Sequence, residues 1–191
     1  MAETVLGMFR HGQTEWNINL RLQGTADTHL NQSGIDQVEM AAAVIGEWDL
    51  LLTSPLSRAR QSAEIISKAI GLEPVVSERL LERSFGIGEG MTYEQWHQRY
   101  SKLDQIPGAE SEFSVFRRSQ KLLDEIQTEH CGKRVLVVTH GALIRFVLNL
   151  VTDNQFPPKG ERLMNASLHT FRFSDSWRLD RWSPESIGLD H

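Results

Sequence analysis

Two arginines, two histidines and one carboxylate follow extended runs of this sequence, where a sheet would place them at one edge. Arg10 and His11 come directly after a short apolar run, Arg58 follows a second run, and His140 follows a third. Glu82 closes the extended stretch VVSERLLE. Guanidinium and imidazole groups bind phosphoryl oxygens, a neutral imidazole can attack phosphorus, and a carboxyl group can move protons. The set therefore suits chemistry on a phosphoryl group.

Each of these residues also has a structural interpretation when it is taken alone. A single histidine beside a strand is more often a surface or core residue than a catalyst. Arg58 could be a solvated helix residue, and Glu82 could pair with Arg79 or Arg83. The functional interpretation depends on the coincidence of several strand ends, and spacing alone does not show that the strands are neighbours.

Short apolar runs alternate with helical patterns along the chain, which predicts an α/β fold with a parallel sheet. Strands are expected at residues 5–9, 49–53 and 134–139, each apolar on both faces as strands covered by helices are. In such sheets ligands bind outside the carboxyl ends of the strands, where helix N-termini offer backbone N–H groups. Residues that follow a strand directly are therefore the candidates for a site.

Four helices and a hairpin are also expected, from periodicity and turn residues. Helices are predicted over residues 31–48, over a segment that Ser54 caps with Pro55 at its first position, over 110–129 and over 142–151. A hairpin is predicted from SLHTFRF and SWRLDRW. The stripe predicted to be buried in the second helix is Ala59, Ala63, Ile66 and Ile70, and that in the third is Phe113, Phe116, Leu123 and Ile126.

The length, charge and cysteine content of the chain limit the functions that it can have. A chain of 191 residues fits one domain, expected over residues 1–182, with a loose tail at 183–191. Its 20 basic and 25 acidic residues give a net charge of −5, which argues against a nucleic-acid partner. Cys131 is the only cysteine, no secretory signal opens the sequence, and no apolar run approaches the about 20 residues that span a bilayer. These features predict a reduced, cytoplasmic protein without a membrane partner.

Five blocks carry a resemblance to a known family. They are RHGQTEWN, RLQGTADTHLNQSG, TSPLSRARQSAEII, LLERSFGIGEG and VVTHGALIR, in this order. Together they resemble the histidine phosphatase superfamily, in its phosphoglycerate mutase-like branch. The resemblance implies a three-layer α/β/α fold with a mainly parallel central sheet, and a reaction through phosphohistidine. It also implies His11 as the nucleophile, Glu82 as the proton donor, and phosphoryl binding by Arg10, Asn17, Gln23, Gly24, Arg58, His140 and Gly141.

The implied chemistry explains these residue types. A histidine nucleophile must be neutral, with one ring nitrogen free and the other donating a hydrogen bond. The cations Arg10 and Arg58 are expected to favour that neutral ring, and Gly12 is expected to let the backbone approach the ligand closely. Glu82 would protonate the leaving oxygen and later take a proton from water. No metal or other cofactor is expected, because the histidines lack metal-ligand spacing and the lone cysteine excludes a thiolate cluster.

Two positions depart from the pattern of the family. Gln13 stands where many relatives have glutamate, and Ser62 where many have threonine. Neither departure changes the assignment. Gln13 is expected to alter the electrostatics behind the nucleophile.

Three functions remain open, in order of preference. The segment between Glu82 and the GAES motif is short, and a short lid lets water reach a phosphoenzyme, which favours a phosphatase. The alternatives are a cofactor-dependent phosphoglycerate mutase and an inactive phosphate-binding module, although the latter would usually lack the nucleophile or the acid. The expected partner is a small phosphorylated metabolite, whose identity is left open, as is a homodimer. Residues 86–96 and 153–167 are the candidate lid segments.

Overall fold

The computed structural model describes residues 3–183 and 185, and within them six strands form one sheet. The strand order is β3-β2-β4-β1-β5-β6. The first four strands in the chain pair in parallel, and β5 and β6 add an antiparallel hairpin. The predicted mainly parallel sheet and the hairpin are both confirmed. The strands are β1 (Thr4–Arg10), β2 (Leu50–Thr53), β3 (Pro74–Val76), β4 (Arg134–Thr139), β5 (Leu168–Phe173) and β6 (Trp177–Arg181).

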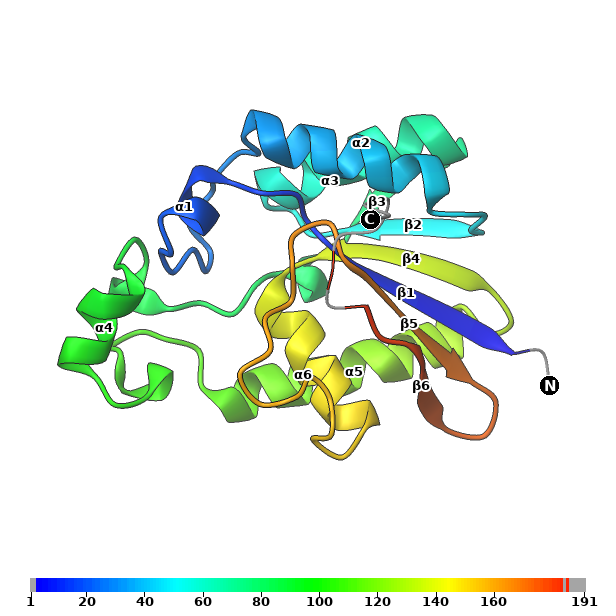
Figure 1. Ribbon diagram of the computed structural model, residues 1–191. Coiled ribbons are helices and arrows are strands. Elements are labelled where there is room, and N and C mark those ends of the chain that lie inside the picture. Colours follow the sequence, from blue (N-terminus) through cyan, green and yellow to red (C-terminus); the bar gives the residue numbers. More distant parts are fainter. Residues whose placement is uncertain (1–2, 184, 186–191) are drawn as a thin grey trace.

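Helices cover both faces of this sheet, so the predicted three-layer arrangement is confirmed. Figure 1 shows α2 and α3 on one face and α5 and α6 on the other. No helix in the described part of the chain is long and apolar enough to cross a membrane. The α-helices are α1 (Glu15–Ile18), α2 (Gln32–Val44), α3 (Ser57–Ile70), α4 (Tyr93–Arg99), α5 (Glu112–Glu129) and α6 (Gly141–Val151), and the 3₁₀ turns are Glu78–Leu80, Gly86–Gly88 and Leu103–Gln105.

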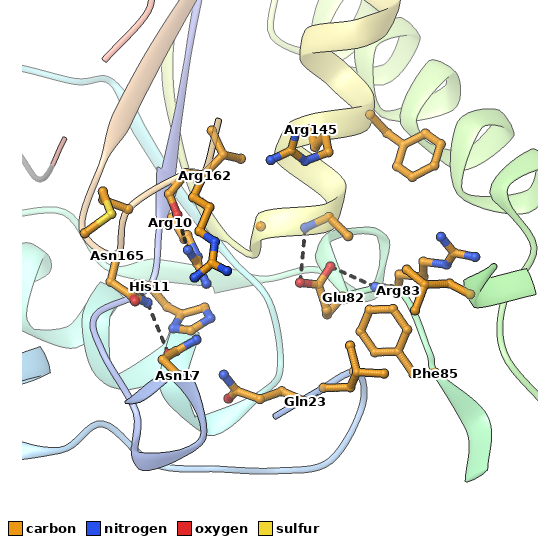
Figure 2. A pocket seen from close by; sticks show the side chains of 18 of the residues that line it. Arg10, His11, Asn17, Gln23, Glu82, Arg83, Phe85, Arg145, Arg162 and Asn165 are labelled. Atoms are coloured by element: carbon orange, nitrogen blue, oxygen red, sulfur yellow. Dashed lines mark hydrogen bonds between the residues drawn. The ribbon is translucent and has the colours of Figure 1, made fainter. Parts of the chain in front are cut away.

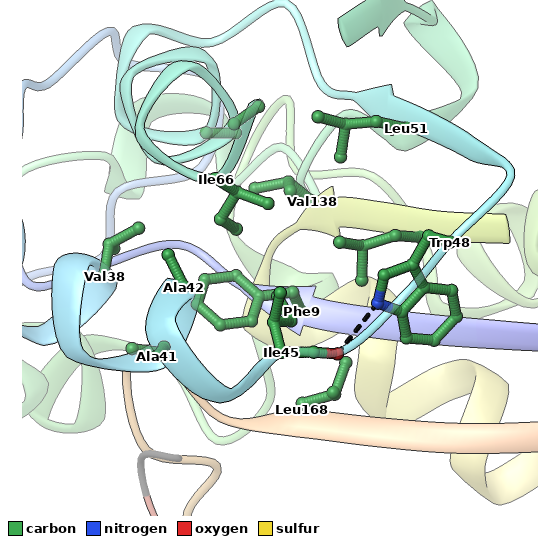
Figure 3. Packing of buried hydrophobic residues seen from close by; sticks show 14 of the residues in the cluster. Phe9, Val38, Ala41, Ala42, Ile45, Trp48, Leu51, Ile66, Val138 and Leu168 are labelled. Atoms are coloured by element: carbon green, nitrogen blue, oxygen red, sulfur yellow. Dashed lines mark hydrogen bonds between the residues drawn. The ribbon is translucent and has the colours of Figure 1, made fainter. Parts of the chain in front are cut away.

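Strand β1 supplies side chains to two separate hydrophobic cores because successive residues of a strand point to opposite faces. Phe9 packs with α2 and α3, whereas Leu6 and Met8 pack with α5 and α6. Burying one such side chain stabilises the fold by about 1.5–3 kcal/mol. Figure 3 shows Trp48 with Phe9 and Ile45 in one of these cores. A Cβ at Gly7 would be 2.3 Å from the Trp48 ring. The glycine is required by this close approach.

Two helices begin or end at other residues than the sequence predicted. The helix predicted over 31–48 begins after its N-cap Asn31 but ends at Val44. Gly46 follows with φ of 79°, a left-handed conformation that ends the helix and lets Trp48 turn back to the core. Ser54 does not cap α3, which has Leu56 at its N-cap without a side-chain bond. Sequence could not show this, because Ser54 finds its partner elsewhere in the fold.

Of two other predictions about local structure, one is wrong in part and one is wrong. The predicted stripe of α5 is confirmed at Leu123 and Ile126, which are buried, but not at Phe113 and Phe116. In α5 the buried face contains Val115, Ser119 and Leu122, whereas Phe113 is 69% exposed and Phe116 39% exposed. A helical repeat shows which residues share a face of the helix, but not which neighbouring element covers that face. The sequence therefore could not show which of two adjacent faces of α5 is buried. The extended stretch that leads to Glu82 is broken, because β3 ends at Val76 and a 3₁₀ turn follows. Of the predicted tail at 183–191, residues 184 and 186–191 lie outside the described residues.

The segment between Glu82 and α5 forms a small layer of its own beside the sheet. Its 3₁₀ turns and α4 pack around Leu22, Phe85, Trp96 and Ile106, apart from the two main cores. Figure 1 shows α4 standing away from the sheet on the side of the strand ends. This layer forms one wall of the cavity described below.

Candidate active site

The carboxyl ends of β1, β4 and β2 lie side by side, which brings together the residues that follow these strands. The His11 N–H donates to the Thr139 carbonyl at 3.0 Å, and the Ser54 N–H donates to the Val138 carbonyl at 3.1 Å. These bonds continue the hydrogen-bond pattern between the parallel strands past the strand ends. The rings of His11 and His140 are therefore neighbours, with centroids 5.2 Å apart. The expectation that separate strand ends converge is confirmed.

His11 is held as a neutral imidazole of defined tautomer. Its ring is 2% exposed, and its Nδ1 lies 2.7 Å from the Gly12 carbonyl oxygen, which can only accept. The Nδ1 therefore carries the proton, and Nε2 carries the lone pair. Burial holds the pKa of His11 well below its usual value, and the charges of Arg58 and Arg10 lower it further. The ring meets the requirements of a nucleophile at neutral pH.

Arg10 and Arg58 are fixed by backbone carbonyls and keep donors for a ligand. Arg10 Nη1 donates to the Leu163 carbonyl, and Arg58 donates to the carbonyls of Ala26 at 2.8 Å and Gly24 at 2.7 Å. Burial lowers the pKa of Arg58 to about 10, so the group stays charged at neutral pH. The buried Nε atoms of both arginines have no acceptor among the described residues. Buried donors are normally paired, so these two point to an anionic ligand.

His140 presents a third such donor. Its Nε2 lies 2.7 Å from the Ser54 hydroxyl, and its buried Nδ1 has no partner within the described chain. Burial holds the pKa of His140 well below its usual value, and Arg58 lowers it further. The ring is therefore neutral. We assign the Ser54 hydroxyl as the donor to Nε2, which places the proton on Nδ1, the ring nitrogen without a partner in the described chain.

Two amide side chains are oriented by hydroxyl and backbone donors around Thr14. The Asn17 Oδ1 accepts from the Thr14 N–H at 3.0 Å, and the Gln23 Oε1 accepts from the Thr28 hydroxyl at 2.6 Å. Because the oxygens are engaged, the NH₂ groups are the ends available to a ligand. Figure 2 shows Asn17 and Gln23 on the same side of the cavity as His11. Both residues line the cavity, as the sequence predicted.

Gly24 and Gly141 contribute backbone groups to the site. The Gly24 carbonyl accepts from Arg58, so this glycine helps to fix the Arg58 guanidinium group. Gly141 begins α6, and its N–H belongs to the first turn of that helix, which favours anions. A Cβ at Gly141 would lie 3.4 Å from Arg10 Nε, so this residue packs directly against the guanidinium group.

Glu82 lies across the cavity from His11 (Figure 2). Its Oε1 accepts from the Arg83 N–H at 2.9 Å, and its Oε2 accepts from the Ala142 N–H at 3.2 Å. These bonds fix the carboxyl group at the start of α6. Each oxygen keeps another lone pair, so one of them can still carry a proton. The structure thus places Glu82 at the edge that the sequence predicted, although through a 3₁₀ turn rather than a strand.

The surrounding cavity has a volume of about 880 Å³. Within the described residues, no cluster of three or more His, Cys, Asp or Glu side chains could hold a metal ion. The wall beyond Arg10, His11 and Arg58 is partly apolar and aromatic. It includes Trp16, Leu20, Tyr93, Phe116, Phe146 and Met164.

The chain matches the model of a known protein family over nearly its whole length. The model of the histidine phosphatase superfamily (branch 1) matches residues 6–184. The chain belongs to this superfamily.

The relatives of this histidine phosphatase carry two kinds of name. An uncharacterized phosphatase, PhoE of Bacillus subtilis (strain 168), is 33% identical over 96% of this chain and 96% of that protein. A probable phosphoglycerate mutase, GpmB of Yersinia enterocolitica, is 31% identical over 95% of this chain and 91% of its own length. The solved phosphoserine phosphatase of Entamoeba histolytica with 3-phosphoglyceric acid has a TM-score of 0.84, at 28% identity over 97% of this chain and 99% of that one. The predicted phosphoglycerate mutase-like fold is confirmed.

Sequence reasoning missed two residues that position the histidines of this phosphatase. Asn165, which is buried, donates to the His11 carbonyl at 3.0 Å and to the Asn17 Oδ1 at 3.2 Å. Ser54 was assigned as a helix cap, but its hydroxyl contacts His140. No local pattern could have found Asn165, because only the pairing of β5 with β1 brings it to the site.

Gly12 and the two departures from the family pattern have structural explanations. A Cβ at Gly12 would lie 2.4 Å from the Gly34 carbonyl oxygen, so the glycine admits the first turn of α2 rather than a ligand. This corrects the prediction. The Ser62 hydroxyl accepts from the Gly12 N–H at 3.1 Å, and the Gln13 Oε1 accepts from Asn31 at 3.2 Å. Both side chains tie the nucleophile loop to its neighbouring helices.

Proposed function

We propose that this histidine phosphatase hydrolyses phosphomonoesters of small metabolites through a phosphohistidine intermediate on His11. The observation that carries the proposal is the state of His11: buried, neutral, and with Nδ1 bound to the Gly12 carbonyl. Three buried N–H groups without partners in the described chain belong to its neighbours Arg10, Arg58 and His140. A nucleophile beside unsatisfied donors matches the needs of phosphoryl transfer, which depends on positioning and charge stabilisation.

The first step transfers the phosphoryl group to the enzyme. His11 Nε2 attacks phosphorus, the ester P–O bond breaks, and Glu82 gives its proton to the leaving oxygen. The products are an alcohol and phosphohistidine. Arg10 and Arg58 balance the charge of the phosphoryl oxygens, while the His140 Nδ1–H and the two amide groups donate to them.

The second step restores the enzyme. Glu82, now a carboxylate, takes a proton from the water that attacks phosphorus, and the P–N bond breaks. Inorganic phosphate leaves and His11 is again neutral. A cavity of about 880 Å³ leaves room for water beside a small alcohol, which supports hydrolysis over transfer back to the product.

Trapping of the intermediate tests this proposal. Rapid quench with a ³²P-labelled substrate should give a protein-bound label that is acid-labile and alkali-stable, as a phosphoramidate is. The His11→Ala variant should give no label and no turnover. A label that survives acid, or that persists in His11→Ala, would refute the mechanism. Turnover lost in His11→Ala also excludes an inactive binding module.

A phosphoglycerate mutase is the second candidate, because several similar proteins are named probable phosphoglycerate mutase. Incubation with 3-phosphoglycerate, with and without 2,3-bisphosphoglycerate, separates the two. We expect phosphate to appear faster than the 2-isomer and without the bisphosphate. The opposite order would favour the mutase. A metal-independent reaction, a cytoplasmic location and the choice between monomer and homodimer stay predictions.

A further inference from the structure

Four arginines line the cavity besides Arg10 and Arg58: Arg21, Arg83, Arg145 and Arg162. Arg83 pairs with Asp104, and Arg21 donates to the Gly90 carbonyl at 2.7 Å. Arg145 and Arg162 flank the space that faces Glu82 (Figure 2). We propose that they bind a second anionic group of the substrate, so that the enzyme prefers phosphomonoesters whose organic part carries a carboxylate or another phosphate. The inference rests on the proposed phosphatase function and adds the substrate class to it.

Arg145 belongs to the helix that begins at the phosphoryl-binding residues. It lies one turn after Gly141, and both residues line the cavity. Four residues of helix advance by about 6 Å, so Arg145 stands one step further along the wall from the phosphoryl group. Its Nη2 donates to the Glu161 carbonyl at 2.7 Å, which occupies one of its five N–H groups. The remaining donors can reach an anion.

Arg162 is presented to the same space by a loop that is tied down on both sides. The Glu161 carbonyl accepts from Arg145, and the Leu163 carbonyl accepts from Arg10. The Arg162 guanidinium lies over the Tyr93 ring, 5.7 Å from its centroid. Figure 2 shows Arg145, Arg162 and Arg10 around one open space that faces Glu82. The loop therefore holds Arg162 above the substrate region.

These two arginines differ from Arg83 in their ion pairs. Neither Arg145 nor Arg162 forms an ion pair with a carboxylate of the described residues, whereas Arg83, also at the cavity, pairs with Asp104. Arg10 and Arg58 already match the two charges of a phosphoryl dianion. Burial lowers the pKa of Arg10, and the charge of Arg145 contributes to this shift, so the cations act on one another. A second anion would relieve this repulsion.

A purely structural role is the competing explanation, since Arg145 tethers the loop through Glu161. Loss of a tether would weaken turnover of every substrate alike. Loss of an anion site would weaken turnover only of substrates that carry the second anion. The comparison of matched substrates therefore separates the two explanations.

The experiment measures kcat/KM for 3-phosphoglycerate, a sugar bisphosphate and glycerol 3-phosphate, which resembles 3-phosphoglycerate without its carboxylate. The enzymes are wild type, Arg145→Gln, Arg162→Gln and the control Arg60→Gln, whose side chain is exposed on α3 outside this cavity. A charge-assisted hydrogen bond is worth about 1.5–3 kcal/mol, so each cavity variant should lose about 10- to 150-fold on a substrate with a second anion. Glycerol 3-phosphate should lose far less, and Arg60→Gln should resemble wild type.

Each outcome decides the question. A preference of the wild type for 3-phosphoglycerate that both cavity variants abolish supports a carboxylate as the second anion, and the same pattern for the bisphosphate alone supports a phosphate. Equal losses on all three substrates overturn the proposal in favour of the tether. A wild type that hydrolyses glycerol 3-phosphate as well as the others overturns it too, while the phosphatase function stands. Absence of His11-dependent turnover on any substrate would instead refute the proposed function.

Discussion

Replacing Glu82 by glutamine removes the proposed acid but keeps the shape of the side chain. The two carboxyl oxygens accept from the backbone N–H groups of Arg83 at 2.9 Å and Ala142 at 3.2 Å. An amide has one oxygen, so one N–H group would face an NH₂ group and lose its acceptor. Leaving a buried N–H group without its acceptor costs about 1–3 kcal/mol of stability. This structural loss does not depend on which substrate is bound.

The loss of the acid, in contrast, depends on the leaving group. General acid catalysis contributes about 10²- to 10⁴-fold, or about 2.7–5.4 kcal/mol at 1.36 kcal/mol for each factor of ten. Glycerol 3-phosphate has a poor leaving group and should lose this factor in addition to the structural loss. p-Nitrophenyl phosphate, whose leaving group departs unprotonated, should show the structural loss alone. The ratio of the two losses therefore isolates proton donation.

The assay compares kcat/KM for both substrates in wild type and Glu82→Gln, with Glu78→Gln as an exposed control outside the cavity. The parameter kcat/KM reports the steps up to the first irreversible one and so excludes later attack by water. In Glu82→Gln, p-nitrophenyl phosphate should also give a burst, because hydrolysis of the phosphoenzyme becomes slow. Equal losses for both substrates without a burst would refute the role of Glu82. His140 would then be the next candidate for the acid.

Four further predictions follow from particular contacts. Ser54→Ala removes the hydroxyl that lies 2.7 Å from His140 Nε2. The kcat/KM should fall by about 5- to 150-fold, equivalent to about 1–3 kcal/mol, while the circular dichroism spectrum stays unchanged. Wild-type activity of this variant would contradict the tautomer assigned to His140. Gly7→Ala would place a Cβ 2.3 Å from Trp48 and should destabilise the fold by about 1–3 kcal/mol, measured by thermal denaturation; an unchanged Tm would contradict the packing. Activity should survive prolonged EDTA treatment, and a loss that a divalent ion restores would count against a metal-independent reaction. Burial lowers the pKa of His169 to about 3, so the unfolded chain binds a proton below about pH 6.5 that the folded chain does not. The free energy of unfolding should therefore fall by up to about 1.4 kcal/mol per pH unit as the pH decreases from 6.5, and urea denaturation of His169→Gln should show a shallower dependence.

The sequence alone determined the parts of the site that adjoin a strand. Arg10 is the last residue of β1, His11 follows it directly, and His140 directly follows β4. A buried strand in a parallel sheet reveals itself as a short apolar run, and its end fixes where the next residues lie. The fold class could therefore be predicted before any contact was known, whereas the family was identified by the resemblance of five sequence blocks.

Only the tertiary structure decided which distant residues complete the site. Asn165 reaches the His11 carbonyl because β5 pairs antiparallel with β1, with Leu168 opposite Phe9. The contact of Ser54 with His140 likewise spans 86 positions of the chain. Local spacing carries no information about such pairs, since they depend on strand order.

The burial of apolar faces was also decided by the fold. The sequence offered Phe113 and Phe116 as core residues of α5, yet the buried face of this helix contains Val115 and Leu122. Leu122 packs in the core that α6 and the sheet share. Phe116 lines the cavity instead. A helix shows which residues share a face through its own repeat, but which face is buried depends on the element that packs against it.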